Sequence, residues 1–331
     1  MTDPTRLSSL ISLYAGIHEE LERVERSLQE FGRSPNPLVA EINDYLFQPG
    51  GKRVRPALLI LSAKLHGYEG DEHVFWSALV EVIHTASLIH DDIIDNADRR
   101  RGRETVHARW GSNITVLLGD FLYIQAIKNA LATRRLPIID IMAEVTSRMI
   151  EGELLECSSS GDPEIGEQTY FEILEKKTAS LFSAACRIGG ILGSAGEADV
   201  ARLGSFGTNI GLAFQVVDDL LDFTGQPSLL GKPVLSDLRE GRITLPLILT
   251  LRRLKGRDGE ELRRWIRDRG SDPEAPARIQ AAVAANGALD ETARRAARFA
   301  DSARSFLRGF PDSPAVATLL QLGDFILERA T

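Results

Sequence analysis

Two short runs of aspartates are the side chains of this sequence best suited to chemistry. Asp91, Asp92 and Asp95 form the run DDIID at the end of a strongly apolar stretch. Asp91 and Asp95 are four residues apart, so on a helix they share one face. Three carboxylates within one turn, near the negative end of a helix dipole, repel one another until a cation neutralises them. Mg²⁺ suits this role, because it bridges one or two carboxylates to phosphate oxygens.

The same spacing recurs at Asp218, Asp219 and Asp222, again at the end of an apolar stretch. Together with Gln215, these side chains lie at i, i+3, i+4 and i+7, on one helical face. A single run of this kind is equally well explained as an acidic, solvated helix end. Two runs could face each other across a helix bundle and hold several Mg²⁺ ions between them. The pair therefore favours a site for a metal-bound diphosphate.

Basic residues near these runs supply the charge that an anion needs. The run GGKRVRP at 50–56 predicts a glycine turn that opens into a helix. The N-terminus of that helix, with Lys52 and Arg55, would bind an anion. Arg100 and Arg101 follow the first aspartates, where they could straddle a metal-bound diphosphate. Each cation alone is more often a solvated surface group, so the prediction depends on their grouping. Further candidates are Lys177 and Lys232.

His84 is a candidate substrate contact. It lies seven residues before Asp91, which is two turns of a helix. His84, Ser87 and Asp91 would therefore lie on the same helical face. A single histidine on an apolar helix is more often a core residue, but this alignment favours a functional role. We do not interpret it as a metal ligand, because no second His or Cys lies at ligand spacing. The sequence has no nucleophile elbow, P-loop or dinucleotide-binding glycine pattern.

The elements that must position these residues are helices. Apolar residues recur at i, i+3 or i+4, and i+7 almost throughout, whereas alternation with period two is scarce. We expect an amphipathic helix from Leu7 past Leu28 and a short one at 38–46. The long polar stretches 96–111 and 224–241 are expected to be functional loops. Further helices are expected at about 53–66, 71–95, 112–133, 137–158, 167–193 and 197–223.

Composition limits the class of protein. With 43% hydrophobic residues, the 331-residue chain can bury a sizeable core. No linker separates its halves, so we expect one all-α domain over residues 1–331. The net charge of −8 argues against nucleic acid as a partner, because non-specific binding to nucleic acid needs a basic surface.

The chain also has features expected of a cytoplasmic protein. Its two cysteines are too few for a disulfide framework, which fits a reducing compartment. The first residues lack the basic and apolar regions of a signal peptide. No run approaches the roughly 18 consecutive apolar residues of a membrane span. We therefore expect a soluble protein, with peripheral membrane contact for product release left open.

In order along the chain, these runs resemble the polyprenyl synthetases, the trans-isoprenyl diphosphate synthases. The resemblance covers roughly residues 38–250. It implies a single all-α bundle of about a dozen helices around a central cavity, the class I isoprenoid synthase type. The motifs that carry it are GGKRVRP at 50–56, HTASLIHDDIIDNADRRRG at 84–102, GDF at 119–121, KKTASLF at 176–182, FQVVDDLLD at 214–222, GKP at 231–233 and DLREGRITLP at 237–246.

The resemblance also implies a role for each candidate residue. The six aspartates would hold Mg²⁺, three ions once diphosphate is bound. Gln215 and Thr178 would face a developing carbocation. The residues that would bind isopentenyl diphosphate are Lys52, Arg55, His84 and Arg101. Those that would bind the allylic diphosphate are Arg100, Lys177 and Lys232.

The implied activity is head-to-tail chain elongation by ionisation, condensation and proton loss, in a chain that would be a homodimer. Three positions depart from the family pattern. Arg242 stands where lysine is frequent and keeps the charge. Leu235 replaces a common glycine in the flap loop, and Glu156 replaces the usual glutamine of the cavity wall.

Small residues before the first aspartates indicate a medium-to-long product. Short-chain members of the family often have an aromatic ring near positions where this chain has Ala86 and Ser87. We expect a deep cavity whose floor is formed by larger side chains such as Leu79, Val80 or Ile83. The alternative is that the small residues only allow close helix packing.

Three other functions fit parts of the same pattern. A short-chain farnesyl or geranylgeranyl diphosphate synthase differs only in product length. A class I terpene cyclase is also helical and Mg²⁺-dependent, but the second run at 218–222 and the anion site at 50–55 argue against it. A non-catalytic subunit of a heteromeric synthase usually loses aspartates, whereas this chain keeps all six.

Overall fold

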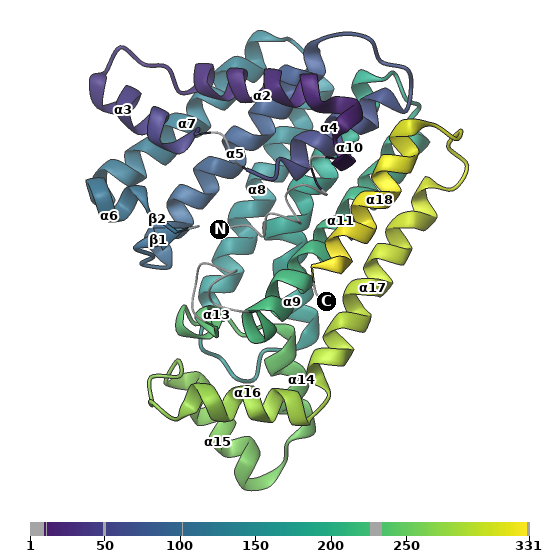
Figure 1. Ribbon diagram of the computed structural model, residues 1–331. Helices are drawn as coiled ribbons and strands as arrows, with labels where there is room; N and C mark the ends of the chain where they lie inside the picture. Colours follow the sequence, from purple (N-terminus) through teal and green to yellow (C-terminus); the bar gives the residue numbers. More distant parts are fainter. Residues whose placement is uncertain (1–9, 11, 49–50, 101, 226–233, 330–331) are drawn as a thin grey trace.

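The computed structural model describes residues 10, 12–48, 51–100, 102–225 and 234–329. Over these residues the chain is helical almost throughout, as expected (Figure 1). The named strands in this part are β1 (Arg99–Arg100) and β2 (Arg103–Glu104), which form a small antiparallel hairpin. The all-α prediction is confirmed.

The first helices form a cover at one end of the molecule. The 3₁₀-helix η1 (Ala15–Ile17) precedes α2 (His18–Phe31), so the expected first helix is interrupted. α2 buries Leu21, Val24 and Leu28, the stripe that a period of 3.6 predicts. The break at 34–37 is confirmed: the Asn36 side chain caps α3 (Pro37–Leu46) by accepting a hydrogen bond from the Leu38 amide at 3.0 Å.

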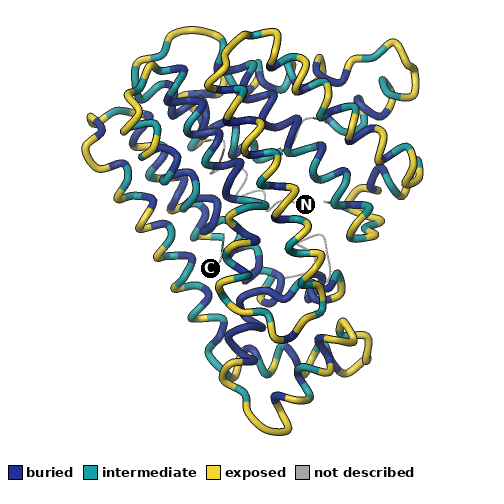
Figure 2. The backbone as a smooth tube through the Cα atoms, turned by 180° about the vertical axis from the view of Figure 1, so that it is seen from behind, coloured by how far each residue is buried: buried dark blue, intermediate teal, exposed yellow. Residues whose placement is uncertain are grey.

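The long helices of the bundle begin and end within two residues of the predicted positions. They are α4 (Val54–Lys64), α5 (Glu72–Ile94), α7 (Ser112–Ala132), α8 (Leu136–Ser158) and α11 (Glu197–Thr224). α4 is buried on nearly every side, and α5 and α11 bury most of their lengths. Figure 2 shows the same arrangement from behind, with buried backbone inside and exposed turns at the edges.

Two segments differ from the prediction. The stretch 167–193 is not one regular helix, because the π-helix η2 (Glu175–Ala179) separates α9 (Glu167–Leu174) from α10 (Ser180–Leu192). The stretch 96–111 is not an open loop. It contains the β1–β2 hairpin and the short helix α6 (Val106–Trp110), whose first turn is capped by the Thr105 hydroxyl. Both features depend on hydrogen bonds that hydrophobic periodicity does not report.

The last third of the chain is also helical. The short helix α13 (Ser236–Arg239) leads into α14 (Leu245–Arg253), and α15 (Gly256–Arg267) and α16 (Ala275–Ala285) lie at the far end from α2 (Figure 1). α17 (Ala288–Leu307) and α18 (Pro314–Glu328) run back along one edge of the bundle. Buried alanines on α17 let it pack closely on α11: Ala296, Ala300 and Ala303.

One helix has an unusual surface. Among the described residues, α7 alone is long and apolar enough to cross a membrane by length and composition, and only 33% of that window is buried. Leu117 and Ile124 are 69% and 61% exposed. The other face of α7 packs on α5. α7 is therefore an apolar helix with one face covered and one face open.

Candidate active site

The two aspartate runs lie where the sequence predicts, at helix ends. Asp91 and Asp92 occupy the last turn of α5, and Asp95 is its C-cap residue. Asp218, Asp219 and Asp222 occupy the last two turns of α11, which continues to Thr224. Each run is thus presented by a long buried helix.

Arg242 connects the two runs. Its guanidinium donates from Nη1 to Asp95 Oδ2 at 2.9 Å and from Nη2 to Asp237 Oδ1 at 2.9 Å. It also contacts Glu240. The Asp237 amide in turn donates to Asp222 Oδ2 at 3.3 Å. Burial alone would lower the pKa of Arg242, but the surrounding carboxylates raise it well above its ordinary value. The runs on α5 and α11 therefore face a common space, as the sequence predicts.

Asp222 holds the strained turn that carries Asp237. Leu235, the residue that replaces a common family glycine, has a left-handed backbone with φ of 58°. For a leucine this conformation costs about 1–2 kcal/mol. The carboxylate of Asp222 accepts from the Ser236 hydroxyl at 2.7 Å and from the Ser236 amide at 3.2 Å. These bonds, and the burial of the Leu235 side chain, offset the strain.

Asp219 is the centre of a buried hydrogen-bond network. Tyr170 of α9 donates its hydroxyl proton to Asp219 Oδ2 at 2.6 Å, and Gln215 Nε2 donates to Oδ1 at 2.9 Å. Thr178 donates to Gln215 Oε1 at 3.3 Å, which fixes the orientation of the amide. Burial, and then the charge of Asp237, raises the pKa of Asp219 to about 8. The structure thus brings together Thr178, Gln215 and Asp219.

Lys177 lies beside the first run and within a π-helix, a wide turn that is frequent at functional sites. Its Nζ is 2.5 Å from Glu153 Oε2 and also contacts Glu156, both on α8. Gly152 permits this approach, because a Cβ there would lie 2.6 Å from the Lys177 backbone nitrogen. Burial raises the pKa of Asp91 to about 7, with Lys177 opposing and Glu153 adding to the rise.

Two further cations each pair with an aspartate. Arg100 of β1 donates from Nε to Asp92 Oδ1 at 2.7 Å, in agreement with its predicted place at the site. Arg329, just after α18, lies 2.5 Å from Asp218 Oδ1 and stacks on the Phe214 ring, with 4.9 Å from its guanidinium carbon to the ring centre. Sequence reasoning missed Arg329, because it is 111 residues from Asp218 and lacks a motif of its own.

The residues of the predicted anion site lie at the start of α4. Lys52 precedes the helix and Arg55 lies in its first turn, with its guanidinium carbon 4.6 Å from the centre of the Phe182 ring of α10. His84 lies half-buried in α5, where its carbonyl accepts from the Ser87 hydroxyl at 2.8 Å. Two predicted site residues lie outside the described residues: Arg101 and Lys232.

The site residues suit magnesium in their chemistry. In the described part of the chain, no three His, Cys, Asp or Glu side chains form a ready-made metal cluster. The available donors are carboxylate oxygens, and burial raises the pKa of Asp91, Asp92 and Asp219. A bound cation would remove this penalty on the charged form. Mg²⁺ fits such a site, because it takes one or two carboxylates, keeps several waters and completes its shell with phosphate oxygens.

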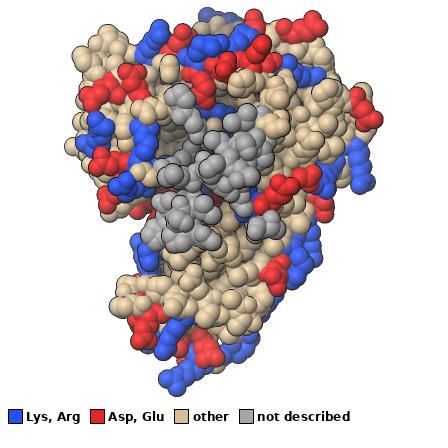
Figure 3. Space-filling view, in the orientation of Figure 1, with Lys and Arg blue, Asp and Glu red and all other residues tan. Residues whose placement is uncertain are grey.

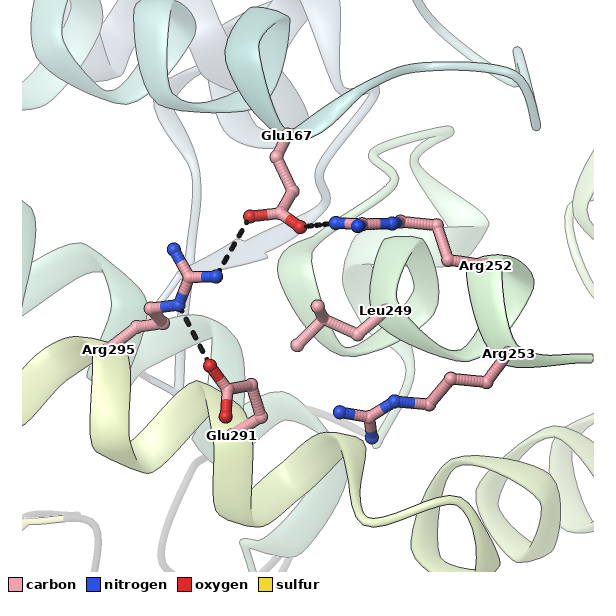
Figure 4. Close-up of a pocket in the computed structure, with 6 residues that line it drawn as sticks. All are labelled: Glu167, Leu249, Arg252, Arg253, Glu291 and Arg295. Atoms are coloured by element: carbon pink, nitrogen blue, oxygen red, sulfur yellow. Dashed lines mark hydrogen bonds and ion pairs between the residues drawn. The ribbon is translucent and has the colours of Figure 1, made fainter.

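A separate polar pocket of about 270 Å³ lies among α9, α14 and α17 (Figure 4). Its carboxylates are already paired: Glu167 contacts Arg252 and Arg295, and Glu291 accepts from Arg295 Nε at 2.9 Å. None of its lining residues belongs to the aspartate site.

Figure 3 shows acidic and basic side chains interspersed over one face of the molecule.

Comparison with known proteins finds relatives over most of the chain. The family model of the polyprenyl synthetases matches residues 36–285. The octaprenyl diphosphate synthase of Escherichia coli (strain K12) is 35% identical over 311 residues, which cover 94% of this chain and 96% of that protein.

Solved structures agree over nearly the whole length. The polyprenyl synthase of Caulobacter crescentus CB15, complexed with calcium and isoprenyl diphosphate, is 34% identical with a TM-score of 0.93, covering 97% of this chain and 98% of that one. The decaprenyl diphosphate synthase of Rhodobacter capsulatus is 34% identical with a TM-score of 0.92, covering 97% and 99%. The chain therefore belongs to the polyprenyl synthetase family.

Proposed function

We propose that this protein is a Mg²⁺-dependent polyprenyl diphosphate synthase that adds isopentenyl diphosphate units to an allylic diphosphate and releases a medium-to-long-chain product. The observation that carries the proposal is the bridge from Asp95 through Arg242 and Asp237 to Asp222. It makes the two aspartate runs face one space, in which a diphosphate can be held from both sides.

The aspartates of both runs would hold the metal ions, which we propose to be three. When bound, Mg²⁺ neutralises the diphosphate and stabilises the negative charge that develops on it as it leaves. Four of these aspartates have cationic neighbours that could shift to the diphosphate. Asp92, Asp95 and Asp218 pair with Arg100, Arg242 and Arg329, and Asp91 lies near Lys177.

Binding of the allylic diphosphate and stabilisation of the carbocation would depend on this chain's own residues. Lys177 and Arg100 would bind the allylic diphosphate, which is supported by their positions beside the first run. Thr178 and Gln215 form a fixed pair of dipoles that would face the developing carbocation. The apolar interior of the bundle keeps water from this cation. The isopentenyl double bond attacks this cation and forms the new carbon–carbon bond, so the reaction requires no protein nucleophile. A diphosphate oxygen then accepts the proton that is lost.

We further propose that the enzyme is a homodimer built on α7 and α8. An open apolar patch of this extent is typical of an interface. Two copies related by a twofold axis would cover the same patch on each other. The exposed large side chains of the patch are Val116, Leu117, Ile124, Ile127, Leu131, Leu136, Ile150 and Leu154.

The test is product analysis with the purified full chain alone. It is supplied with farnesyl or geranylgeranyl diphosphate, isopentenyl diphosphate and Mg²⁺, and the products are identified by mass spectrometry. We expect polyprenyl diphosphates longer than geranylgeranyl diphosphate, and no turnover after chelation of the metal. A farnesyl or geranylgeranyl end product would indicate a short-chain synthase, and a cyclised hydrocarbon a terpene cyclase. No product from the single chain would indicate a non-catalytic subunit.

A further inference from the structure

The middle cation of the run GGKRVRP is bound by protein carboxylates rather than left for a diphosphate. Arg53 lies between Lys52 and Arg55 in sequence, yet its guanidinium is taken up by two carboxylates. Nε and Nη2 donate to the two oxygens of Glu25 on α2, at 2.5 and 2.9 Å. Nη1 donates to Glu81 on α5 at 2.9 Å. The side chain is only 12% exposed, so this group is part of the interior.

The backbone of Arg53 has a strained conformation that the contacts of its side chain must maintain. Its φ is 46°, in the left-handed region that costs a non-glycine residue about 1–2 kcal/mol. Arg53 is also the N-cap residue of α4, so the strained turn sets where the helix begins. Burial by itself would lower the pKa of Arg53, but the hydrogen bonds and charges of Glu25 and Glu81 raise it above its ordinary value. The guanidinium is therefore a fixed positive charge that joins α2, α4 and α5.

Gly51 makes room for the same guanidinium. A Cβ at position 51 would lie 2.9 Å from Arg53 Nη1. A free arginine could move away from such a contact, but this one is held by three hydrogen bonds. The left-handed turn is thus held by Gly51 and by the carboxylates of Glu25 and Glu81. Arg55 follows directly after this turn.

We infer that Arg53 is a positioning residue for the isopentenyl diphosphate end of the site. The inference rests on the proposed function and deepens it. By fixing the left-handed turn, Arg53 sets the directions of Lys52 and Arg55 relative to the first turn of α4. Two cations and a helix N-terminus bind the diphosphate, while the third cation anchors them to α2 and α5. Lysine cannot replace it, because only a guanidinium makes the bidentate contact with Glu25 while reaching Glu81.

The test compares Arg53→Lys and Gly51→Ala with a matched control, Arg135→Lys. Arg135 makes the same kind of bidentate contact with Glu72, at the N-terminal end of α5. Isopentenyl diphosphate alone is titrated calorimetrically into each full-length protein. KM for isopentenyl diphosphate, KM for the allylic diphosphate and kcat are then measured separately. Circular dichroism verifies that each variant is folded.

We expect Arg53→Lys and Gly51→Ala to weaken isopentenyl diphosphate binding and raise its KM about tenfold, the equivalent of about one hydrogen bond to a charged group. The allylic KM should change less than about twofold. The control should match the wild type. Gly51→Ala keeps the test valid should Arg53→Lys fail to fold. Folded variants with lower thermal stability but unchanged binding of isopentenyl diphosphate would overturn the inference about Arg53 and leave the proposed function standing. A wild type that does not bind isopentenyl diphosphate would overturn the proposed function as well.

Discussion

At the scale of single residues, the site is defined by carboxylates that the fold buries before any cation is bound. Asp91 and Asp219 have pKa values raised to about 7 and about 8, chiefly by burial. The charged form of each is therefore costly in the metal-free protein. A bound cation would remove this cost.

Asp91→Asn should separate function from stability. Turnover with Mg²⁺ should fall by about a thousandfold, because the variant loses a carboxylate that would hold the Mg²⁺ stabilising the leaving diphosphate. Without metal, the melting temperature at pH 8 should be equal to or above that of the wild type. The folded-state pKa of Asp91 is raised, so its ionisation costs stability as pH rises from the ordinary aspartate value to about 7, and asparagine removes that cost.

The control for this experiment is Asp140→Asn, which changes an exposed aspartate on α8. Its turnover and melting temperature should match the wild type at pH 5 and pH 8. The gain in stability of Asp91→Asn should be larger at pH 8 than at pH 5. Near-normal turnover in Asp91→Asn would rule out the metal role of the first run.

At the scale of elements, α5 presents both the metal run and the predicted wall of the product cavity. Ala86 has no exposed surface, whereas Ser87 is partly exposed. The expected floor residues Leu79, Val80 and Ile83 are all buried, at no more than 2% exposure. A ring at position 87 can therefore enter accessible space, while one at position 86 must also displace packed neighbours at a cost of about 1–3 kcal/mol.

Ser87→Phe should shorten the product to farnesyl or geranylgeranyl size, because the ring fills most of the width between packed helices one turn below the aspartates. Ala86→Phe should shorten it too, but with a lower melting temperature. Ser87→Ala is the control and should keep the wild-type product. Mass spectrometry of the products and initial rates of substrate use provide the measurement. An unchanged product in Ser87→Phe, at an unchanged rate, would contradict this view of the cavity.

The end of α18 meets the end of α11 at Asp218. Arg329→Gln should lower the Mg²⁺ concentration for half-maximal turnover about threefold, because a cation at Asp218 no longer competes with the guanidinium that pairs with it. A parallel titration of Mg²⁺ with inorganic pyrophosphate should show the same shift. Arg304→Gln, which removes an exposed pair between α17 and α18, is the control. An unchanged or higher Mg²⁺ requirement in Arg329→Gln would show that the pair does not oppose the metal.

Most of the long helices could be predicted from the sequence. The long helices were predicted to within two residues, because a period of 3.6 is a local signal. The six aspartates and Arg100 could be proposed as candidates because they lie in short motifs. The π-helix at Lys177 could not be found, since it depends on packing against α8 at Gly152. Arg329 was missed because only the fold brings it to Asp218.

At the scale of the whole molecule, one apolar surface is left open on α7 and α8, while charges of both signs are interspersed on the face shown in Figure 3. The family resemblance predicts a homodimer, and we propose that this surface is its interface. A second copy would also explain why α7 has the length and composition of a membrane span without being surrounded by protein on all sides.

A double variant, Leu117→Glu with Ile124→Glu, should convert the dimer into a monomer, because it places four carboxylates in the twofold interface. Leu38→Glu, at an exposed leucine on α3, is the control and should stay dimeric. Light scattering after size-exclusion chromatography gives the mass of each. A wild type that is monomeric at micromolar concentration, or a dimeric double variant, would exclude this interface.

The π-helix has a consequence for how the chain tolerates changes in length. A π turn accommodates about one residue more than the α turn it replaces, so it acts as an insertion inside the continuous helical segment from α9 to α10. Deleting one residue from Glu175–Ala179 would therefore restore a regular α turn and leave α10 facing its present neighbours. Deleting one residue within α10 itself would instead rotate everything beyond the deletion by about 100° and turn its buried face away from α4 and α11. The π turn is thus the place in this segment where a one-residue deletion should leave the packing of α10 unchanged.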